Sequence, residues 1–231
     1  MNFNFSNLSN TSFSSDSQSY LKPYDIHKVV LSKIEKSVLK GSKDPDASFD
    51  IVAIEFTGVG DSKGIFSTNL FVPNKDDDFE RTVNKTSGKT QPSSFERFQF
   101  TLMQIVEAIN PSGAQKIKDN ASKLKTIDQF IELIIKALNG KKTEVYLKLV
   151  GRNNNGKIYS SLPTSCWLDG DTPKPLNFIN VDPTKLNFSN YEMTQAKNYK
   201  EAKPTEMKDN EGDNNPDTKE TGDINLDDLD I

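Results

Sequence analysis

The spacing of hydrophobic residues changes twice along this chain, and this change limits the folds that it can adopt. Three segments rich in β-branched and aromatic residues have the character of strands, at residues 25–41, 47–58 and 64–73. Helical spacing follows over residues 93–139, and strand character returns at residues 143–152 and 157–163. The sequence therefore predicts three strands, a helical insert and two further strands, in that order.

The helical insert carries two start signals. Ser93 is followed three residues later by Glu96, which is the spacing of a capping box, and Asn110–Pro111 is expected to stop the helix that begins there. Thr126 and Gln129 repeat the same spacing ahead of a second apolar stripe. We expect two helices with their apolar faces in the core.

This order of elements predicts a mainly β fold with a helical insert, in the α+β class. It is the order of an OB-fold, a five-stranded Greek-key barrel with its helices between strands 3 and 4. A generic α+β domain stays open as the alternative. We expect a disordered arm rich in Asn and Ser over residues 1–20, a folded body over 21–200 and a disordered acidic tail over 201–231.

The charge is divided unevenly between the body and the tail. Residues 209–231 contain nine acids and one base, a balance of −8. The whole chain has 33 acids and 29 bases, so the remaining residues hold 24 acids and 28 bases, a balance of +4. A basic body joined to an acidic tail points to a polyanion-binding protein with an interaction tail, although a tail that serves only solubility is the simpler reading.

Composition argues against several functional classes. The only cysteine is Cys166 and the only histidine is His27, so a disulfide within the chain and a Cys/His zinc cage are both excluded, and a reducing cytosol is the default setting. No apolar run is long enough to span a membrane, and no signal pattern precedes the body. The acids Asp76–Asp78 lack further ligands for Mg²⁺, so we favour a solvated loop there. We expect neither an enzyme nor a cofactor.

The strands at 143–152 and 157–163 contain the best candidate for a binding surface. Between Lys141 and Tyr159 there are five bases and one acid, and Asn153–Gly156 suits a tight hairpin turn. With a symmetric turn, Arg152 would lie near Lys157, and Val150 near Tyr159. The residues expected to share one face of this hairpin are Tyr146, Lys148, Arg152, Lys157 and Tyr159.

Cations that follow phosphates, combined with aromatic faces that stack on bases, are what a single-stranded nucleic acid requires. Exposed hairpins also alternate lysine and tyrosine for solubility and sheet propensity, so the pattern has a plainer explanation. Phe71 is a weaker candidate for a further stacking platform.

The acidic tail also contains aliphatic residues that a solubility tail does not need. Electrostatic attraction would hold the tail over the cationic face until a denser polyanion displaces it. Once free, it would suit a partner protein with an apolar pocket surrounded by Lys or Arg. The residues assigned to partner binding are Asp223, Ile224, Leu226, Asp227, Asp228, Leu229, Asp230 and Ile231.

The stretches YLKPYDIHKVVLSKIEKSVLKGSKDPDASFDIVAIEF and FERFQFTLMQIVEAINP resemble single-stranded DNA-binding proteins of tailed bacteriophages, in particular those of crAss-like phages. The resemblance covers about residues 20–200. It implies an OB-fold that coats and protects single-stranded DNA during replication, recombination and repair, in the cytoplasm of a bacterial host. It also implies recruitment of replication and recombination proteins through the tail, and no cofactor. This chain ends in Leu229–Asp230–Ile231, whereas bacterial and T7-like members of the wider class end in an acidic run closed by phenylalanine, which leaves the tail's partners open.

Two other functions stay open from the sequence. A structural or packaged virion protein of a phage would use residues 1–20 as an assembly arm. A metal-dependent nuclease would use Asp76–Asp78. The sequence does not decide whether the chain forms a homo-oligomer, or whether it prefers DNA or RNA.

Overall fold

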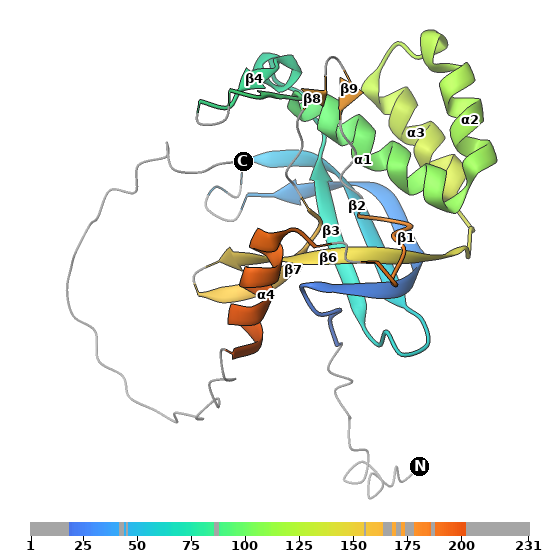
Figure 1. The fold of residues 1–231 in the computed structure, drawn as a ribbon. Helices are drawn as coiled ribbons and strands as arrows, with labels where there is room; N and C mark the ends of the chain where they lie inside the picture. The colour runs from blue at the N-terminus through green and yellow to red at the C-terminus, as the bar shows by residue number, and fades with distance from the viewer. Residues whose placement is uncertain are drawn as a thin grey trace, which may run out of the picture.

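A computed structural model gives the fold of the chain (Figure 1). The residues that it describes are 19–41, 44, 46–85, 88–154, 156–163, 168–169, 172–173, 178–185 and 188–201. The predicted arm lies outside these residues apart from positions 19 and 20, and the predicted tail lies outside them apart from position 201.

The described residues form an α+β fold around one five-stranded antiparallel sheet, in the order β3-β2-β1-β6-β7. Its strands are β1 (Asp25–Lys40), β2 (Ser48–Gly58), β3 (Ile65–Phe71), β6 (Glu144–Asn154) and β7 (Lys157–Ser161). These are the five strands that the sequence predicts, and the helices between the third and fourth of them are also confirmed.

Strand β1 is long enough to pair with two neighbours in succession. Residues 25–30 pair with β6, whereas residues 29–40 pair with β2. The register of the β1–β2 pair shifts between Leu31 and Lys33, which leaves Ser32 as an extra residue. Such a bulge increases the local twist and bends the strand. This bend lets β1 carry the sheet around a corner, as Figure 1 shows.

The sheet is not a closed barrel, which corrects the prediction of a five-stranded barrel. No ladder joins β3 to β7 in the part of the chain that the structure describes. Residues 19–21 lie between these strands instead: Leu21 N–H donates to Ile65 O, and Ile65 N–H donates to Ser19 O, both at 2.9 Å. On the other side, the Ser160 hydroxyl donates to the carbonyl of Leu21. Residues 19–21 therefore pair with β3 through main-chain hydrogen bonds, but their hydrogen bond with β7 is made by the side chain of Ser160.

Three helices lie between β3 and β6, namely α1 (Ser94–Ile109), α2 (Pro111–Asp119) and α3 (Ile127–Leu138). The capping box of Ser93 and Glu96 at the start of α1 is confirmed, with hydrogen bonds in both directions. Thr126 caps α3 by accepting from Gln129 N–H, but the Gln129 side chain accepts from Lys125 N–H and not from Thr126 N–H.

Helix α2 was not predicted, because Asn110–Pro111 was interpreted only as a stop signal. The Asn110 side chain accepts from Gly113 N–H at 3.1 Å and so caps a new helix. Pro111 occupies the first helical position, where its missing N–H costs nothing and its fixed φ suits a helix. The same two residues therefore end α1 and begin α2.

The remaining elements are short, except for one helix near the end of the described chain. They are the 3-10 helices η2 (Asp76–Phe79) and η3 (Ala121–Lys123), the hairpins β4 (Thr82–Val83) with β5 (Thr90–Gln91) and β8 (Leu168–Asp169) with β9 (Thr172–Pro173), and the helix α4 (Asn190–Glu201). None of the described helices has the length and apolar character needed to cross a lipid bilayer.

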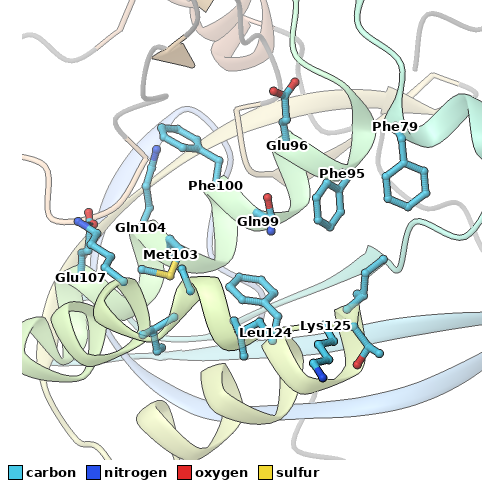
Figure 2. Close-up of a pocket in the computed structure, with 16 residues that line it drawn as sticks. Phe79, Phe95, Glu96, Gln99, Phe100, Met103, Gln104, Glu107, Leu124 and Lys125 are labelled. Atoms are coloured by element: carbon cyan, nitrogen blue, oxygen red, sulfur yellow. Dashed lines mark ion pairs between the residues drawn. The ribbon is translucent and has the colours of Figure 1, made fainter.

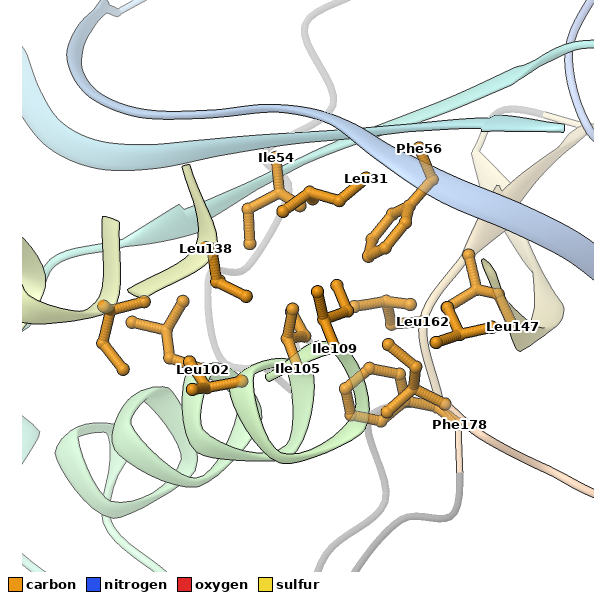
Figure 3. Packing of buried hydrophobic residues seen from close by; sticks show 14 of the residues in the cluster. Leu31, Ile54, Phe56, Leu102, Ile105, Ile109, Leu138, Leu147, Leu162 and Phe178 are labelled. Atoms are coloured by element: carbon orange, nitrogen blue, oxygen red, sulfur yellow. The ribbon is translucent and has the colours of Figure 1, made fainter. Parts of the chain in front are cut away.

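The hydrophobic core lies between one face of the sheet and the helices α1 and α3. Phe56 of β2 and Leu147 of β6 meet Leu102 and Ile105 of α1, all of them fully buried (Figure 3). Burying a side chain of this size stabilises the fold by about 1.5–3 kcal/mol. Because alternate residues of each strand supply this core, the other face of the sheet is left for other contacts.

Candidate nucleic-acid interface

The two faces of β6 have different surroundings, as the alternation of its residues predicts. Val145, Leu147 and Leu149 are buried in the core on the side of α1. The side chains between them, including Tyr146 and Lys148, point to the opposite face. We call this opposite face of the sheet the outer face.

The register of the β6–β7 hairpin differs from the prediction by two residues. Arg152 stands opposite Tyr159, and Asn154 stands opposite Lys157. The turn is shorter than expected because the Asn153 side chain accepts from Gly156 N–H, and Gly156 has a φ of +79° that favours glycine. A shift by an even number leaves every side chain on its predicted face. The predicted membership of the face is therefore right, whereas the predicted neighbours were wrong.

The end of this hairpin presents two cations beside an aromatic ring. Tyr159 is 53% exposed, and Arg152 and Lys157 are exposed as well. Because Arg152 lies directly across the ladder from Tyr159, its guanidinium and the ring belong to one patch. We call Arg152, Lys157 and Tyr159 the hairpin patch.

Lys148 lies in different surroundings from the hairpin patch. Its residue is only 7% exposed, and its Nζ lies 3.0 Å from each carboxylate oxygen of Glu192 in α4. The same nitrogen stands 4.8 Å from the centre of the Phe188 ring. In this conformation, Lys148 holds α4 against the outer face and is not presented to solvent. Tyr146, two residues earlier, is half-buried.

Helix α4 is a part of this surface that the sequence interpretation missed. The Ser189 hydroxyl accepts from Glu192 N–H at 3.2 Å, and Glu192 Oε2 accepts from Ser189 N–H at 2.7 Å. This is a capping box with the same Ser-x-x-Glu spacing as Ser93 and Glu96, so the signal was present in the sequence. The weakly apolar composition of the helix hid it, since no clear stripe follows the cap.

The contacts of α4 explain the ionisation of Glu192. Burial alone would raise the pKa of this carboxyl, but hydrogen bonds from Ser189 and from Lys148 outweigh it and hold the pKa below its ordinary value. Farther along α4, the ring of Tyr199 lies 6.0 Å from that of Tyr24. The Tyr24 hydroxyl donates to the carbonyl of Gly151 at 3.3 Å, and burial raises the pKa of this tyrosine.

Phe71 lies on the outer face too, at the far edge of the sheet. Tracing the opposed pairs from β6 through β1 and β2 to β3 places it on the same face as Tyr146. Phe71 is 56% exposed, and its ring meets that of Phe49 edge-on, with 5.9 Å between their centres. Phe49 was not predicted, although its two-residue spacing from the strand residue Ile51 could have identified it.

The other sequence candidates have structural roles or lie outside the described residues. The Asp78 carboxylate accepts from the N–H groups of Asn74 and Lys75. Among the described residues, no group of three His, Cys, Asp or Glu side chains could hold a metal ion. His27 is buried with its Nε2 2.8 Å from the carbonyl of Lys22. Cys166 and the whole segment Asp223–Ile231 lie outside the described residues.

No protein-family model matches this chain, and no curated protein is significantly similar to it.

Proposed function

We propose that this protein binds single-stranded DNA independently of sequence, and that it coats and protects the strand during DNA replication and recombination in a bacterial host infected by a phage. The observation that carries this proposal is the hairpin patch. It places an exposed aromatic ring directly opposite an arginine, with a lysine beside them, on a sheet face that the core does not use.

The chemistry of the patch suits an unpaired strand. Its two cations attract phosphates, and the Tyr159 ring accepts any base, because every base has a π-face. Stacking of this kind contributes about 1–3 kcal/mol per base. Phe49 and Phe71 offer further rings on the same outer face.

The topology is compatible with an OB-fold that lacks one pairing. In an OB-fold, the first strand pairs with the second and the fourth, and the helix follows the third strand. Here β1 pairs with β2 and with β6, the helices follow β3, and residues 19–21 lie where the closing ladder would be. OB-folds bind oligonucleotides on the face of their second and third strands and at the loops between strands 1 and 2 and between strands 4 and 5. The hairpin patch lies beside the turn between β6 and β7, which corresponds to the loop between strands 4 and 5.

The acidic tail would act on the same surface. Its net charge of −8 over residues 209–231 is attracted to the rest of the chain, residues 1–208, whose net charge is +4. Single-stranded DNA would displace it, and the released segment Asp223–Ile231 would then recruit replication and recombination proteins.

The proposal is tested by titrating the full chain into two fluorescent oligonucleotides of equal length, one of thymidine only and one of mixed sequence. We expect similar affinities for both, and binding that weakens steadily as salt is added. Failure to bind either strand in dilute buffer would refute the proposal.

A further inference from the structure

The helical insert contains an apolar groove that the proposed DNA interface does not use. It has a volume of about 880 Å³ and opens between α1, η3 and the start of α3 (Figure 2). Its apolar lining includes Phe79, Phe95, Phe100, Met103, Leu124 and Phe130. The ring of Phe79 packs on that of Phe95, with 5.1 Å between their centres, but Phe79 is 48% exposed. Apolar surface is therefore open to solvent at this end of the groove.

One polar group in the wall of the groove lacks a partner. The Gln104 Nε2 is buried, and among the described residues it has no hydrogen-bond acceptor. A buried donor left without an acceptor destabilises this part of the wall. Because the nitrogen is buried beside Phe100, an occupant of the open groove reaches it only if a neighbouring side chain moves.

The charges around the groove favour an acidic occupant. Residues 115–126, which form one side of it, carry four lysines and one acid, and because Lys118 pairs with Glu107, a balance of +2 is left for an occupant. The acids on the other side already have cationic partners: Glu107 binds Lys118 at 2.6 Å, and Glu96 binds Arg81 at 2.6 Å. An occupant with aliphatic and acidic side chains matches both the lining and the rim.

We propose that Asp223–Ile231 of the same chain docks in this groove. Four aliphatic and four acidic side chains occur in these nine residues. Only 21 residues separate Glu201 from Asp223, and joining a segment to the body in one chain raises its effective concentration at the groove. This inference rests on the regulatory role proposed above for the tail. It adds that the aliphatic end has its own site, while the acids at residues 209–220 stay available to the hairpin patch.

The test uses the full chain with ¹³C-labelled methionine methyl groups and a nitroxide on the tail. The chain has one cysteine and four methionines, so Cys166→Ser with Asn225→Cys gives a single label site and few signals. Met103 lies in the groove, and Met193 lies in α4. We expect the Met103 signal to lose most of its intensity when the nitroxide is active and to regain it when the nitroxide is reduced.

A matched pair of tail variants gives the control. Adding Leu226→Ser and Leu229→Ser to the labelled chain should restore the Met103 signal, whereas the labelled chain without these two changes keeps the loss. Loss of the Met193 signal with Met103 unchanged would place the tail on the side of α4 and overturn the inference, as would no loss at either methionine. The Met103 signal could also be lost only when a spin-labelled chain is mixed with a separate ¹³C-labelled chain. The occupant would then be the tail of a second copy, which would also overturn the inference. No DNA is present, so these results are independent of the oligonucleotide titration.

Discussion

At the scale of single residues, the ring of Tyr159 is the exposed aromatic group of the hairpin patch. Removing the ring with Tyr159→Ala should weaken binding of single-stranded DNA by about 1–3 kcal/mol, because a base loses its stacking partner. Tyr159→Phe keeps the ring and loses only the hydroxyl, so it should bind like the parent. Fluorescence anisotropy with a labelled oligonucleotide measures both variants. Equal weakening by the two changes would show that the ring does not stack on a base.

Arg152 should contribute through charge, because its guanidinium lies across the ladder from Tyr159. Arg152→Gln should reduce the steepness of the plot of log affinity against log salt concentration by the amount that one phosphate contact contributes. Lys136→Gln removes the same charge from the exposed end of α3, on the helical side of the molecule, and serves as the control. If both variants change the slope equally, the effect comes from overall charge and the patch has no special role.

Lys148 should behave as a structural residue, given its pair with Glu192. Glu192→Ala leaves a buried ammonium without its carboxylate and should lower the free energy of unfolding by about 2 kcal/mol. Lys148→Met combined with Glu192→Leu removes both charges and should recover most of that loss. Urea unfolding followed by circular dichroism compares these variants. Lys148→Met and Glu192→Leu are also measured singly. If the double variant loses as much stability as these two changes added together, the two residues act independently.

At the scale of elements, the start of α1 is held by Glu96, whose carboxylate accepts from Arg81 and from Ser93 N–H. The pKa of Glu96 lies below its ordinary value of 4.5, chiefly because of the hydrogen bond from Arg81, although burial acts in the opposite direction. A lowered pKa in the folded state stabilises the fold above pH 4.5, and this contribution is lost as the pH falls through the folded value.

Glu96→Gln should therefore reduce the free energy of unfolding above pH 4.5 and converge with the parent in more acidic buffer. Urea midpoints measured across this range check the prediction. A constant difference between parent and variant at all pH values would show that ionisation of Glu96 does not contribute.

Sequence patterns identified the strands and the helices α1 and α3, because each has a strong apolar period and a recognisable boundary. They did not identify α2, since Asn110–Pro111 can end one helix and begin another. They also missed α4, whose cap has the right spacing but whose stripe is weak. The position of residues 19–21 between β3 and β7 depends on contacts distant in sequence, which no local pattern contains.

The same limit applies to the candidate site. Alternation placed Tyr159 and Arg152 on one face because that property is local to the hairpin. The burial of Lys148 depends on α4. This helix comes 44 residues later at Glu192, so no local pattern in the sequence shows that it packs on β6. Sequence reasoning could therefore assign the face but not which of its cations reaches solvent.

At the scale of the whole molecule, the tail and the body carry opposite charges. Deleting Asp209–Ile231 should tighten binding of single-stranded DNA, most strongly at low salt, because the competing acidic segment is removed. Oligonucleotide titrations of the full and shortened chains at several salt concentrations measure this effect. Unchanged or weaker affinity after deletion would contradict competition between tail and DNA.

The measurement that tests single-strand binding most directly is a competition with the full chain, a fluorescent single strand and unlabelled competitors of equal length, one single-stranded and one duplex. We expect the single strand to compete better at every salt concentration, since stacking on Tyr159 requires unpaired bases. A duplex that competes equally well, or better, would contradict the assignment of this protein to single-stranded DNA.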